Sequence, residues 1–256
     1  MKPKYPNYRV VIPARYASQR LPGKPLLPVA GQPLIWHVYQ CARQSTATDI
    51  LIATDDPRIA KAAETFGATV SLTRADHQSG TDRIAEVANT QGWEDKDIVV
   101  NLQGDEPEMP ANLLEQVAQA LSDNPDAGIA TLAVPITETT EHTDQAVVKV
   151  VTNQQGQALY FSRAPIPWQR DPAAPTPERL RHLGIYAYRV GFLRRYITWP
   201  SSPLEQAESL EQLRALWHGE IIQVAIAQTI PAPGIDTKQD YQQLLTRLEQ
   251  NNKNTE

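Results

Sequence analysis

The first half of the chain alternates short apolar runs with longer segments in which apolar residues recur at helical spacing. Each run is bracketed by turn residues and is too short for a helix, which is typical of a buried parallel strand. This alternation predicts an α/β fold with a mostly parallel sheet covered on both faces by helices. The predicted strands are Val10–Ile12 (closed by Pro13), Ile50–Ala53, Ala68–Leu72 and Ile98–Leu102, and the predicted helices are Pro33–Ser45, Pro57–Phe66 and a segment ending near Gln91.

The pattern changes after about Ala127, where strands follow one another with fewer helices between them. Val147–Val151 and Gln157–Ser162 are separated by Asn153–Gly156, which is a hairpin turn signal. Further strands are predicted at Gly128–Val134, His182–Tyr188 and Ile221–Ala227, and a single helix is predicted over Ser202–Gly219. We therefore expect a core of residues 1–134 and 220–250, a smaller antiparallel subregion of residues 135–219 and a polar tail of residues 251–256.

The loop after the first strand concentrates positive charge. Arg15, Arg20 and Lys24 follow Pro13 closely, in a segment shaped by Gly23 and three further prolines. Ligands of open α/β sheets bind outside the carboxyl ends of the strands, and fixed cations at that edge favour phosphate groups. We expect this loop to bind a triphosphate, although a basic surface loop is the simpler interpretation.

Two common nucleotide-binding motifs are excluded by the sequence. A P-loop requires Ser or Thr after its Gly-Lys pair, whereas Gly23 and Lys24 are followed by Pro25. The G-x-G-x-x-G fingerprint of dinucleotide-binding proteins does not occur anywhere in the chain. The phosphate site is therefore predicted to belong neither to a P-loop ATPase nor to a Rossmann dehydrogenase.

Composition restricts the partners and the compartment. The 256 residues carry a formal net charge of −5, which argues against nucleic acid or an anionic membrane as a partner. The single cysteine, Cys41, excludes an internal disulfide. The N-terminal segment is polar, and the apolar run behind it is far too short for a secretory signal or a membrane span. We therefore expect a cytoplasmic enzyme.

Two aspartates suggest a site for a hard cation. Asp105 follows the predicted strand Ile98–Leu102 directly after Gly104, and Asp236 follows the predicted strand Ile221–Ala227. Magnesium takes oxygen ligands, commonly one or two carboxylates together with substrate phosphates. Aspartates are also frequent in turns, but the second acid favours a site for a metal-bound nucleotide.

Several blocks of the sequence resemble those of the sugar-acid cytidylyltransferases. The most specific block is IPARYASQRLPGKPL, and the others follow in the order that this family shows. They are RADHQSGTDR, NLQGDEP, YFSRAPIPW, RHLGIYAYR and LEQLR, so the resemblance spans roughly Val10 to Leu245. Within the family, the likeness is greatest to members that act on 3-deoxy-manno-octulosonate (KDO). The resemblance implies a Rossmann-like three-layer α/β/α nucleotidyltransferase fold, Mg²⁺ as cofactor and a homodimer, with the proline-rich Arg170–Glu178 segment as a candidate contact.

CTP is expected to contact three segments of the chain besides the metal site. The resemblance implies that Gln78, Ser79 and Gly80 help to recognise cytosine, and Thr54 and Asp55 follow a strand end where the base or ribose could lie. The full set predicted to bind CTP is Ala14, Arg15, Arg20, Lys24, Thr54, Asp55, Gln78, Ser79 and Gly80.

The resemblance also matches Asp105 and Asp236 with the metal aspartates of the family. Glu106 fits this role less consistently, because the adjoining Pro107 turns the chain away. His77 has no visible acidic partner in the sequence, and we expect a structural role for it.

The sugar acid is expected to contact the later half of the chain. The resemblance matches His182, Glu211 and Gln212 with sugar-acid contacts, and alternation along the strand puts Tyr186 on the face of His182. The carboxylate of the sugar requires a cation, for which Arg163 is the candidate. The full set predicted to bind the sugar is Gln103, Arg163, His182, Tyr186, Glu211 and Gln212.

These assignments predict nucleotidyl transfer. The anomeric hydroxyl of the sugar acid attacks the α-phosphorus of CTP, and the departing pyrophosphate requires positive charge. Lys24 and Arg15, with the metal aspartates Asp105 and Asp236, are the predicted catalytic residues, and CMP-KDO for lipopolysaccharide biosynthesis is the expected product.

Three alternatives stay open: a cytidylyltransferase for 8-amino-KDO or a sialic acid, a glycosyltransferase, and a non-catalytic nucleotide-sugar binding protein. A glycosyltransferase normally shows D-x-D where this chain has Asp105-Glu106-Pro107. The joint presence of Lys24 and two metal aspartates counts against a protein that only binds.

Overall fold

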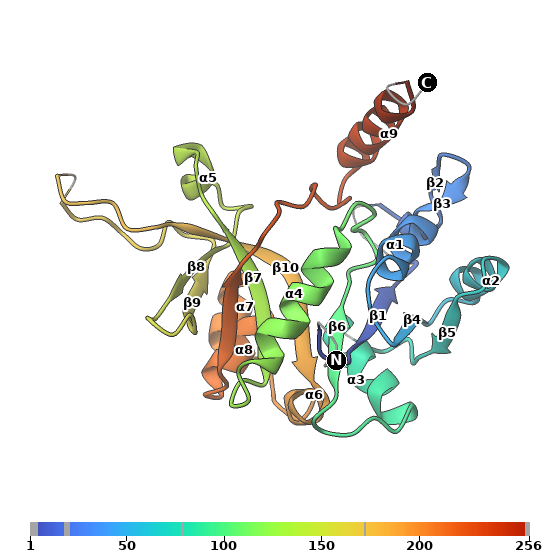
Figure 1. Ribbon diagram of the computed structural model, residues 1–256, viewed down its shortest axis with the longest axis horizontal. Coiled ribbons are helices and arrows are strands. Elements are labelled where there is room, and N and C mark those ends of the chain that lie inside the picture. Colours follow the sequence, from blue (N-terminus) through green and yellow to red (C-terminus); the bar gives the residue numbers. More distant parts are fainter. Residues whose placement is uncertain (1–4, 18–20, 78, 172, 254–256) are drawn as a thin grey trace. The chain divides into compact units, whose positions relative to one another are not determined.

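Figure 1 shows the computed structural model of the chain, which describes residues 5–17, 21–77, 79–171 and 173–253. These residues form two compact units. The parallel-sheet unit comprises Asn7–Trp93, Val99–Glu115 and the described residues from Pro231 onward. The mixed-sheet unit comprises Glu94–Ile98, Gln116–Ile230 and the described residues before Asn7. The predicted limits of the core and the subregion stay a prediction.

The parallel-sheet unit is built on four parallel strands in the order β6-β1-β4-β5. The strands are β1 (Arg9–Ala14), β4 (Asp49–Thr54), β5 (Thr69–Leu72) and β6 (Ile98–Asn101). The helices are α1 (Leu34–Arg43), α2 (Pro57–Thr65), α3 (Gly80–Thr90), the first part of α4 (Ala111–Ser122) and α9 (Lys238–Lys253). A 3-10 turn, η1 (Lys24–Leu26), and the short strands β2 (Pro28–Val29) and β3 (Gln32–Pro33) follow β1.

The apolar runs of the sequence form the centre of this sheet. Val10, Val11 and Ile12 of β1 are completely buried, since β1 has a neighbouring strand on each side and also contacts the helices α1 and α3. The strand continues through Pro13 to Ala14, which lies in register with Thr54. The prediction that Pro13 closes the strand is therefore wrong, because β1 ends at Ala14. The last residues of β1 and β4 are paired, and they lie at the edge of the sheet where ligands of parallel sheets bind.

The mixed-sheet unit is centred on β7 (Ile129–Pro135). This strand pairs in parallel with β11 (Ile222–Ile226) and antiparallel with β10 (Leu180–Arg189). On the other side, β10 pairs with β8 (Lys149–Thr152), which forms the predicted hairpin with β9 (Ala158–Ser162). The helices are the last part of α4, then α5 (Thr139–Thr143), α6 (Val190–Tyr196), α7 (Pro203–Glu208) and α8 (Gln212–Trp217).

The single helix predicted over Ser202–Gly219 is wrong. Ser202 and Glu205 form a capping box that begins α7, but Ser209 adopts a left-handed conformation with a φ of 52° and ends it. A non-glycine residue in this region interrupts the helical hydrogen bonds. Residues after Ser209 therefore do not continue the helical spacing of α7.

Other elements differ less from the expectation. The short helices α5 and α6 were not predicted, and α9 runs to Lys253, into the segment expected to be a polar tail.

The predicted α/β class with a mostly parallel sheet is confirmed. In the part of the chain that the structure describes, no helix is both long enough and apolar enough to cross a lipid bilayer.

Candidate active site

Lys24 and two aspartates meet at one end of the parallel sheet. The ammonium nitrogen of Lys24 lies 2.6 Å from Oδ2 of Asp105 and 3.3 Å from Oδ1 of Asp236. Asp105 and Asp236 follow Lys24 in the chain by 81 and 212 positions, respectively. The structure thus brings together the three residues whose convergence the predicted chemistry requires.

The backbone around Asp105 fixes the position of both acids. Gly104 lies so close to β1 that an added Cβ would stand 2.7 Å from the carbonyl oxygen of Pro13, which only glycine avoids. The carbonyl oxygen of Asp105 accepts a hydrogen bond from the backbone of Ile235 at 2.8 Å. The segment that carries Asp236 is therefore tied directly to the loop that carries Asp105.

Glu106 adds a third carboxyl group to this end of the sheet. Burial, followed by the negative charges of Asp105 and Asp236, raises the pKa of Glu106 to about 7, and the nearby Lys24 opposes the rise. The acids around Lys24 thus carry more negative charge than one ammonium group neutralises. Such an excess favours binding of a further cation.

The donor set fits magnesium that also binds a substrate. Among the residues that the structure describes, no three His, Cys, Asp or Glu side chains converge as an all-protein metal site would require. Magnesium needs only one or two carboxylates when phosphate oxygens and water complete its six ligands. Asp105 and Asp236, which share a contact with one nitrogen atom, provide such a pair.

Gly23, the residue before Lys24, is held by Tyr16. The backbone nitrogen of Gly23, which has a φ of 71°, donates to the carbonyl oxygen of Tyr16 at 2.9 Å. The guanidinium of Arg58 lies 3.3 Å from the centroid of the Tyr16 ring, and Arg58 is paired with Asp56. Neither Tyr16 nor Arg58 was predicted from the sequence, because a contact between Tyr16 and α2 leaves no local signal.

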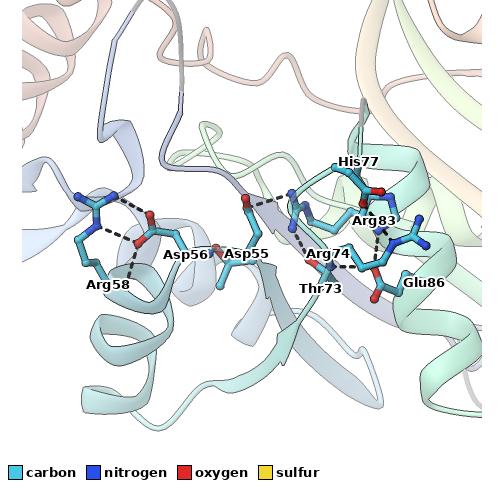
Figure 2. A network of polar contacts seen from close by, with 10 residues as sticks. Asp55, Asp56, Arg58, Thr73, Arg74, His77, Arg83 and Glu86 are labelled. Atoms are coloured by element: carbon cyan, nitrogen blue, oxygen red, sulfur yellow. Dashed lines mark hydrogen bonds and ion pairs between the residues drawn. The ribbon is translucent and has the colours of Figure 1, made fainter.

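A buried arginine pairs with Asp55, the predicted CTP-binding residue that follows β4. The side chain of Arg83, from α3, is completely buried and its Nη2 lies 3.0 Å from Oδ1 of Asp55. Figure 2 shows this pair, with Arg83 also reaching the hydroxyl of Thr73. Burial lowers the pKa of Arg83; the negative charge of Asp55 opposes this, and the positive charge of Arg15 adds to it. Asp55 is therefore a structural partner of Arg83 as well as a CTP candidate.

Most other predicted CTP residues make local contacts. Thr54 is completely buried and its hydroxyl accepts from the backbone of Asp56 at 3.2 Å. Ser79 forms a capping box with Asp82 at the start of α3. Ala14 is buried, and Gly80 begins α3 near Pro13. Gln103, which was predicted to bind the sugar, is exposed. Arg20 and Gln78 lie outside the described residues.

His77 has an acidic partner, so the prediction that it lacks one is wrong. Its Nε2 contacts Glu86 of α3, and Glu86 also accepts from the backbone of Arg74 at 3.1 Å (Figure 2). Nine residues separate His77 from Glu86, and only the path of the chain into α3 brings them together. This network ties Arg74 and His77 to α3, at whose start the predicted cytosine-binding residues Ser79 and Gly80 lie.

His182 and Tyr186 form part of a row of aromatic rings in the mixed-sheet unit. The ring of His182 lies 5.0 Å from Phe161 and 5.3 Å from Tyr186, measured between centroids. Burial lowers the pKa of His182 to about 3, so the ring is neutral at physiological pH. Burial also raises the pKa of Tyr186 well above its usual value, so its hydroxyl stays protonated.

Arg163 is anchored by backbone carbonyl groups. Its Nε donates to the carbonyl oxygen of Glu208 at 2.8 Å, and its Nη1 donates to that of Gln145 at 3.1 Å. The Glu208 carboxylate accepts from Ser162 and from the backbone of Arg163 at 2.6 and 2.9 Å. Lys149, completely buried, donates to three carbonyl oxygens including that of Arg163.

Gln212 and Glu211 lie at the start of α8 and differ in environment. Gln212 is 6% exposed, and within the described part of the chain its buried Nε2 has no hydrogen-bond partner. A buried amide without a partner is costly and points to a missing acceptor. Glu211 is exposed, and its backbone carbonyl accepts from the hydroxyl of Tyr196 at 3.2 Å.

Comparison with known sequences gives one consistent family. The sequence model of the family described as cytidylyltransferase matches residues 9–222. A 3-deoxy-manno-octulosonate cytidylyltransferase of Hahella chejuensis is 57% identical over 244 residues, which cover 93% of this chain and 96% of that protein. The protein of the same name from Yersinia enterocolitica is 53% identical over 239 residues, which cover 91% and 95% of the two chains.

Comparison with solved structures agrees with the sequence comparison. A CMP:2-keto-3-deoxy-manno-octonic acid synthetase complexed with CTP has a TM-score of 0.89 and 43% identity, covering 96% of this chain and all of that chain. A cytidylyltransferase from Leptospira borgpetersenii has a TM-score of 0.62 at 17% identity, covering 94% and 85% of the two chains, and this likeness shows the fold alone.

Proposed function

The chain belongs to the cytidylyltransferase family, and from that premise we propose that it transfers the CMP group of CTP to 3-deoxy-manno-octulosonate. In this reaction the anomeric hydroxyl oxygen of the sugar acid forms a bond to the α-phosphorus of CTP, and the bond from that phosphorus to the pyrophosphate oxygen breaks. The hydroxyl proton is released, and the products are CMP-KDO and pyrophosphate. CMP-KDO is an activated sugar for lipopolysaccharide biosynthesis.

The observation that carries this proposal is the contact of Lys24 with both Asp105 and Asp236. Transfer at phosphorus depends on positioning and on positive charge where the leaving group develops its negative charge. Lys24 is only partly exposed, with 12% of its side-chain surface accessible, so its charge is weakly screened by solvent. We assign Lys24 to the α-phosphate and the leaving pyrophosphate.

Mg²⁺ is the cofactor in this proposal, and Asp105 and Asp236 would hold it. When bound, it supplies positive charge to phosphate oxygens and acidifies a hydroxyl group that coordinates to it. Arg15 supplies a further cation for the phosphates, and its charge is felt at Arg83 next to Asp55. Thr54, Asp55 and the start of α3 are assigned to the cytidine part of CTP.

Five of the six residues predicted to bind the sugar acid lie in the mixed-sheet unit. The guanidinium of Arg163 donates to two neutral carbonyl groups, and we assign it to the carboxylate of the sugar acid. Gln212 offers the buried amide described above to an oxygen of the sugar. His182, Tyr186 and Glu211 complete the set with both donors and acceptors, as a polyhydroxylated ligand requires.

The decisive experiment measures pyrophosphate release by the purified chain with CTP, Mg²⁺ and a panel of sugar acids. We expect turnover with KDO and a much lower kcat/KM with 8-amino-KDO and with a sialic acid. A preference for one of the latter would replace KDO as the substrate and leave the reaction type intact. Binding of CTP without pyrophosphate release from any sugar acid would reject the enzyme in favour of a binding protein.

The compartment and the assembly are part of the same proposal. CTP and the biosynthetic use of its product imply a cytoplasmic enzyme. A homodimer is supported by large apolar side chains at the surface of the mixed-sheet unit, where Trp168 and Leu159 are 80% and 61% exposed. Light scattering coupled to size-exclusion chromatography tests the dimer, and a concentration-independent mass of one chain would contradict it.

A further inference from the structure

The hydroxyl group of Thr131 has three polar neighbours. Thr131 lies in β7 and is completely buried. Its Oγ1 lies 2.7 Å from the carbonyl oxygen of Ile185, 3.1 Å from that of Leu183 and 2.9 Å from Nε2 of His182. All three neighbours belong to β10, the strand antiparallel to β7.

An irregularity in β10 explains why two carbonyl groups reach one side chain. The register against β7 shifts between Leu183, which pairs with Leu132, and Tyr186, which pairs with Thr131. Two extra residues of β10 are therefore fitted into this interval, and their backbone leaves the regular ladder. Bulges of this kind redirect side chains and are common next to functional sites.

Counting hydrogen atoms fixes the direction of the bond to His182. A hydroxyl group carries one hydrogen, and carbonyl oxygens can only accept. The hydrogen of Thr131 must therefore serve the carbonyl oxygens of Ile185 and Leu183, since an oxygen-to-oxygen contact of 2.7 Å without a hydrogen would be repulsive. His182 consequently has to donate from Nε2, and Thr131 accepts.

This direction determines the chemistry of the other ring nitrogen. A neutral imidazole carries one N–H group, so a hydrogen on Nε2 leaves Nδ1 as an acceptor. In the described part of the chain, Nδ1 has no hydrogen-bond partner. The packing against Phe161 and Tyr186 holds the plane of the ring, so that the acceptor has a defined direction.

We propose that Thr131 is a positioning residue that holds His182 in the Nε2–H tautomer, so that Nδ1 accepts a hydrogen bond from a hydroxyl group of the sugar acid. His182 then recognises a hydroxyl group of the sugar. Its one N–H group donates to Thr131, so it has no donor for the sugar carboxylate. This assignment depends on the proposed function for the identity of the ligand, but not for the tautomer itself.

The tautomer can be measured directly in the protein without substrate. The chain is labelled with ¹⁵N-histidine, and two-bond ¹H–¹⁵N correlation spectra are recorded near neutral pH. The signals of His182 are assigned by their absence in His182→Gln. We expect a protonated Nε2 and an unprotonated Nδ1 in the unsubstituted protein, and a protonated Nδ1 there would overturn the proposal.

Two substitutions at Thr131 test the functional part. Thr131→Val keeps the shape of the side chain and removes the hydroxyl group, whereas Thr131→Ser keeps the hydroxyl group. We expect Thr131→Val to mix the tautomers of His182 and to raise the KM for the sugar acid about tenfold, with the KM for CTP within twofold of the original. Thr131→Ser should restore both readouts.

The outcomes separate this proposal from the proposed function. Equal increases of both KM values in Thr131→Val, or failure of Thr131→Ser to restore the sugar KM, would show a merely structural role and overturn the proposal. An Nε2–H tautomer in a protein that releases no pyrophosphate with any sugar acid would reject the function while supporting the tautomer assignment. Because the spectrum is recorded on the unsubstituted protein, poor folding of Thr131→Val does not prevent the tautomer test.

Discussion

The ammonium group of Lys24 lies against the carboxylate of Asp105, with 2.6 Å between Nζ and Oδ2. The same nitrogen reaches Asp236 at 3.3 Å, so one cation of the protein sits between the two acids that are proposed to hold Mg²⁺. Lys24 thus neutralises part of their charge, and its proposed role is to contact the phosphate groups of CTP. This arrangement makes the roles of the three residues separable by experiment.

Replacement of Lys24 should affect turnover more than sugar binding. We expect Lys24→Ala to lower kcat at saturating substrates by about 10²- to 10³-fold, as for the loss of one transition-state donor, with a much smaller change in the KM for the sugar acid. Pyrophosphate release provides the measurement. Lys61→Ala, at an exposed position of α2, is the matched control and should leave kcat unchanged. Equal losses in kcat and in sugar affinity would contradict the role of Lys24.

Removal of either acid should weaken the apparent affinity of the enzyme for magnesium. In Asp105→Asn and Asp236→Asn one of two proposed anionic ligands is lost, so we expect the Mg²⁺ concentration for half-maximal rate to rise at least about tenfold. A titration of the rate with Mg²⁺ at fixed CTP measures this value. Asp123→Asn, at an exposed position after α4, serves as the control. An unchanged magnesium dependence in both variants would remove these acids from the metal site.

Two neighbouring arginine–aspartate pairs should differ in their effect on stability. Figure 2 shows both pairs. The side chain of Arg83, the partner of Asp55, is completely buried, whereas that of Arg58, the partner of Asp56, is 57% exposed. Arg83→Met leaves Asp55 without its buried partner, and we expect a loss of about 3 kcal/mol in the free energy of unfolding. Arg58→Met should cost clearly less, because solvent screens an exposed pair. Urea denaturation of both variants gives the comparison, and equal losses would show that burial does not decide the effect.

Arg163 should act on the sugar acid alone. Its guanidinium is held in place by the carbonyl groups of Glu208 and Gln145, which leave its charge for a carboxylate. We expect Arg163→Ala to raise the KM for the sugar acid by about 10- to 100-fold, as for loss of a charged hydrogen bond, while the KM for CTP stays within twofold. The exposed Arg170 in the same segment provides a control substitution to Ala. A parallel loss of CTP affinity would argue for a general distortion.

His182 should make folding stability depend on pH in the acidic range. Its pKa is about 3 in the folded chain because the ring is buried, and about 6.5 in an unfolded chain. Below pH 6.5 the unfolded chain therefore binds a proton that the folded chain does not, and the free energy of unfolding falls as the pH falls. Between pH 8 and pH 5 this contribution amounts to about 2 kcal/mol.

The measurement compares the unsubstituted protein with His182→Gln across this pH range. The difference between their unfolding free energies should shrink toward low pH and stay constant above about pH 7. A difference that does not change with pH would show that His182 takes up its proton equally in both states.

The elements that the sequence predicts well are those whose signals are local. An apolar run flanked by turn residues is sufficient to predict β1, β4, β5 and β6. The positive charge of the first loop can be read directly from the sequence. Asp105 was predicted at the carboxyl end of its strand, and its pairing with Asp236 was predicted from the family resemblance. Their contact with Lys24 is the geometric condition that the prediction required.

The features that escaped prediction depend on contacts distant in sequence or on a single backbone angle. Ser209 breaks a helix through its left-handed φ, for which serine carries no signal. The contact of His77 with Glu86 and that of Arg83 with Asp55 depend on the packing of α3 in the folded chain. Thr131 becomes an acceptor for His182 only because β10 departs from regular register. None of these relations follows from periodicity.

The contact between Gly104 and the carbonyl oxygen of Pro13 limits how this scaffold can be redesigned. Even one methyl group at position 104 would force the loop that carries Asp105 away from β1. Asp105 would then lose its contact with Lys24. Libraries aimed at new sugar donors should therefore vary the mixed-sheet unit and keep this backbone junction fixed.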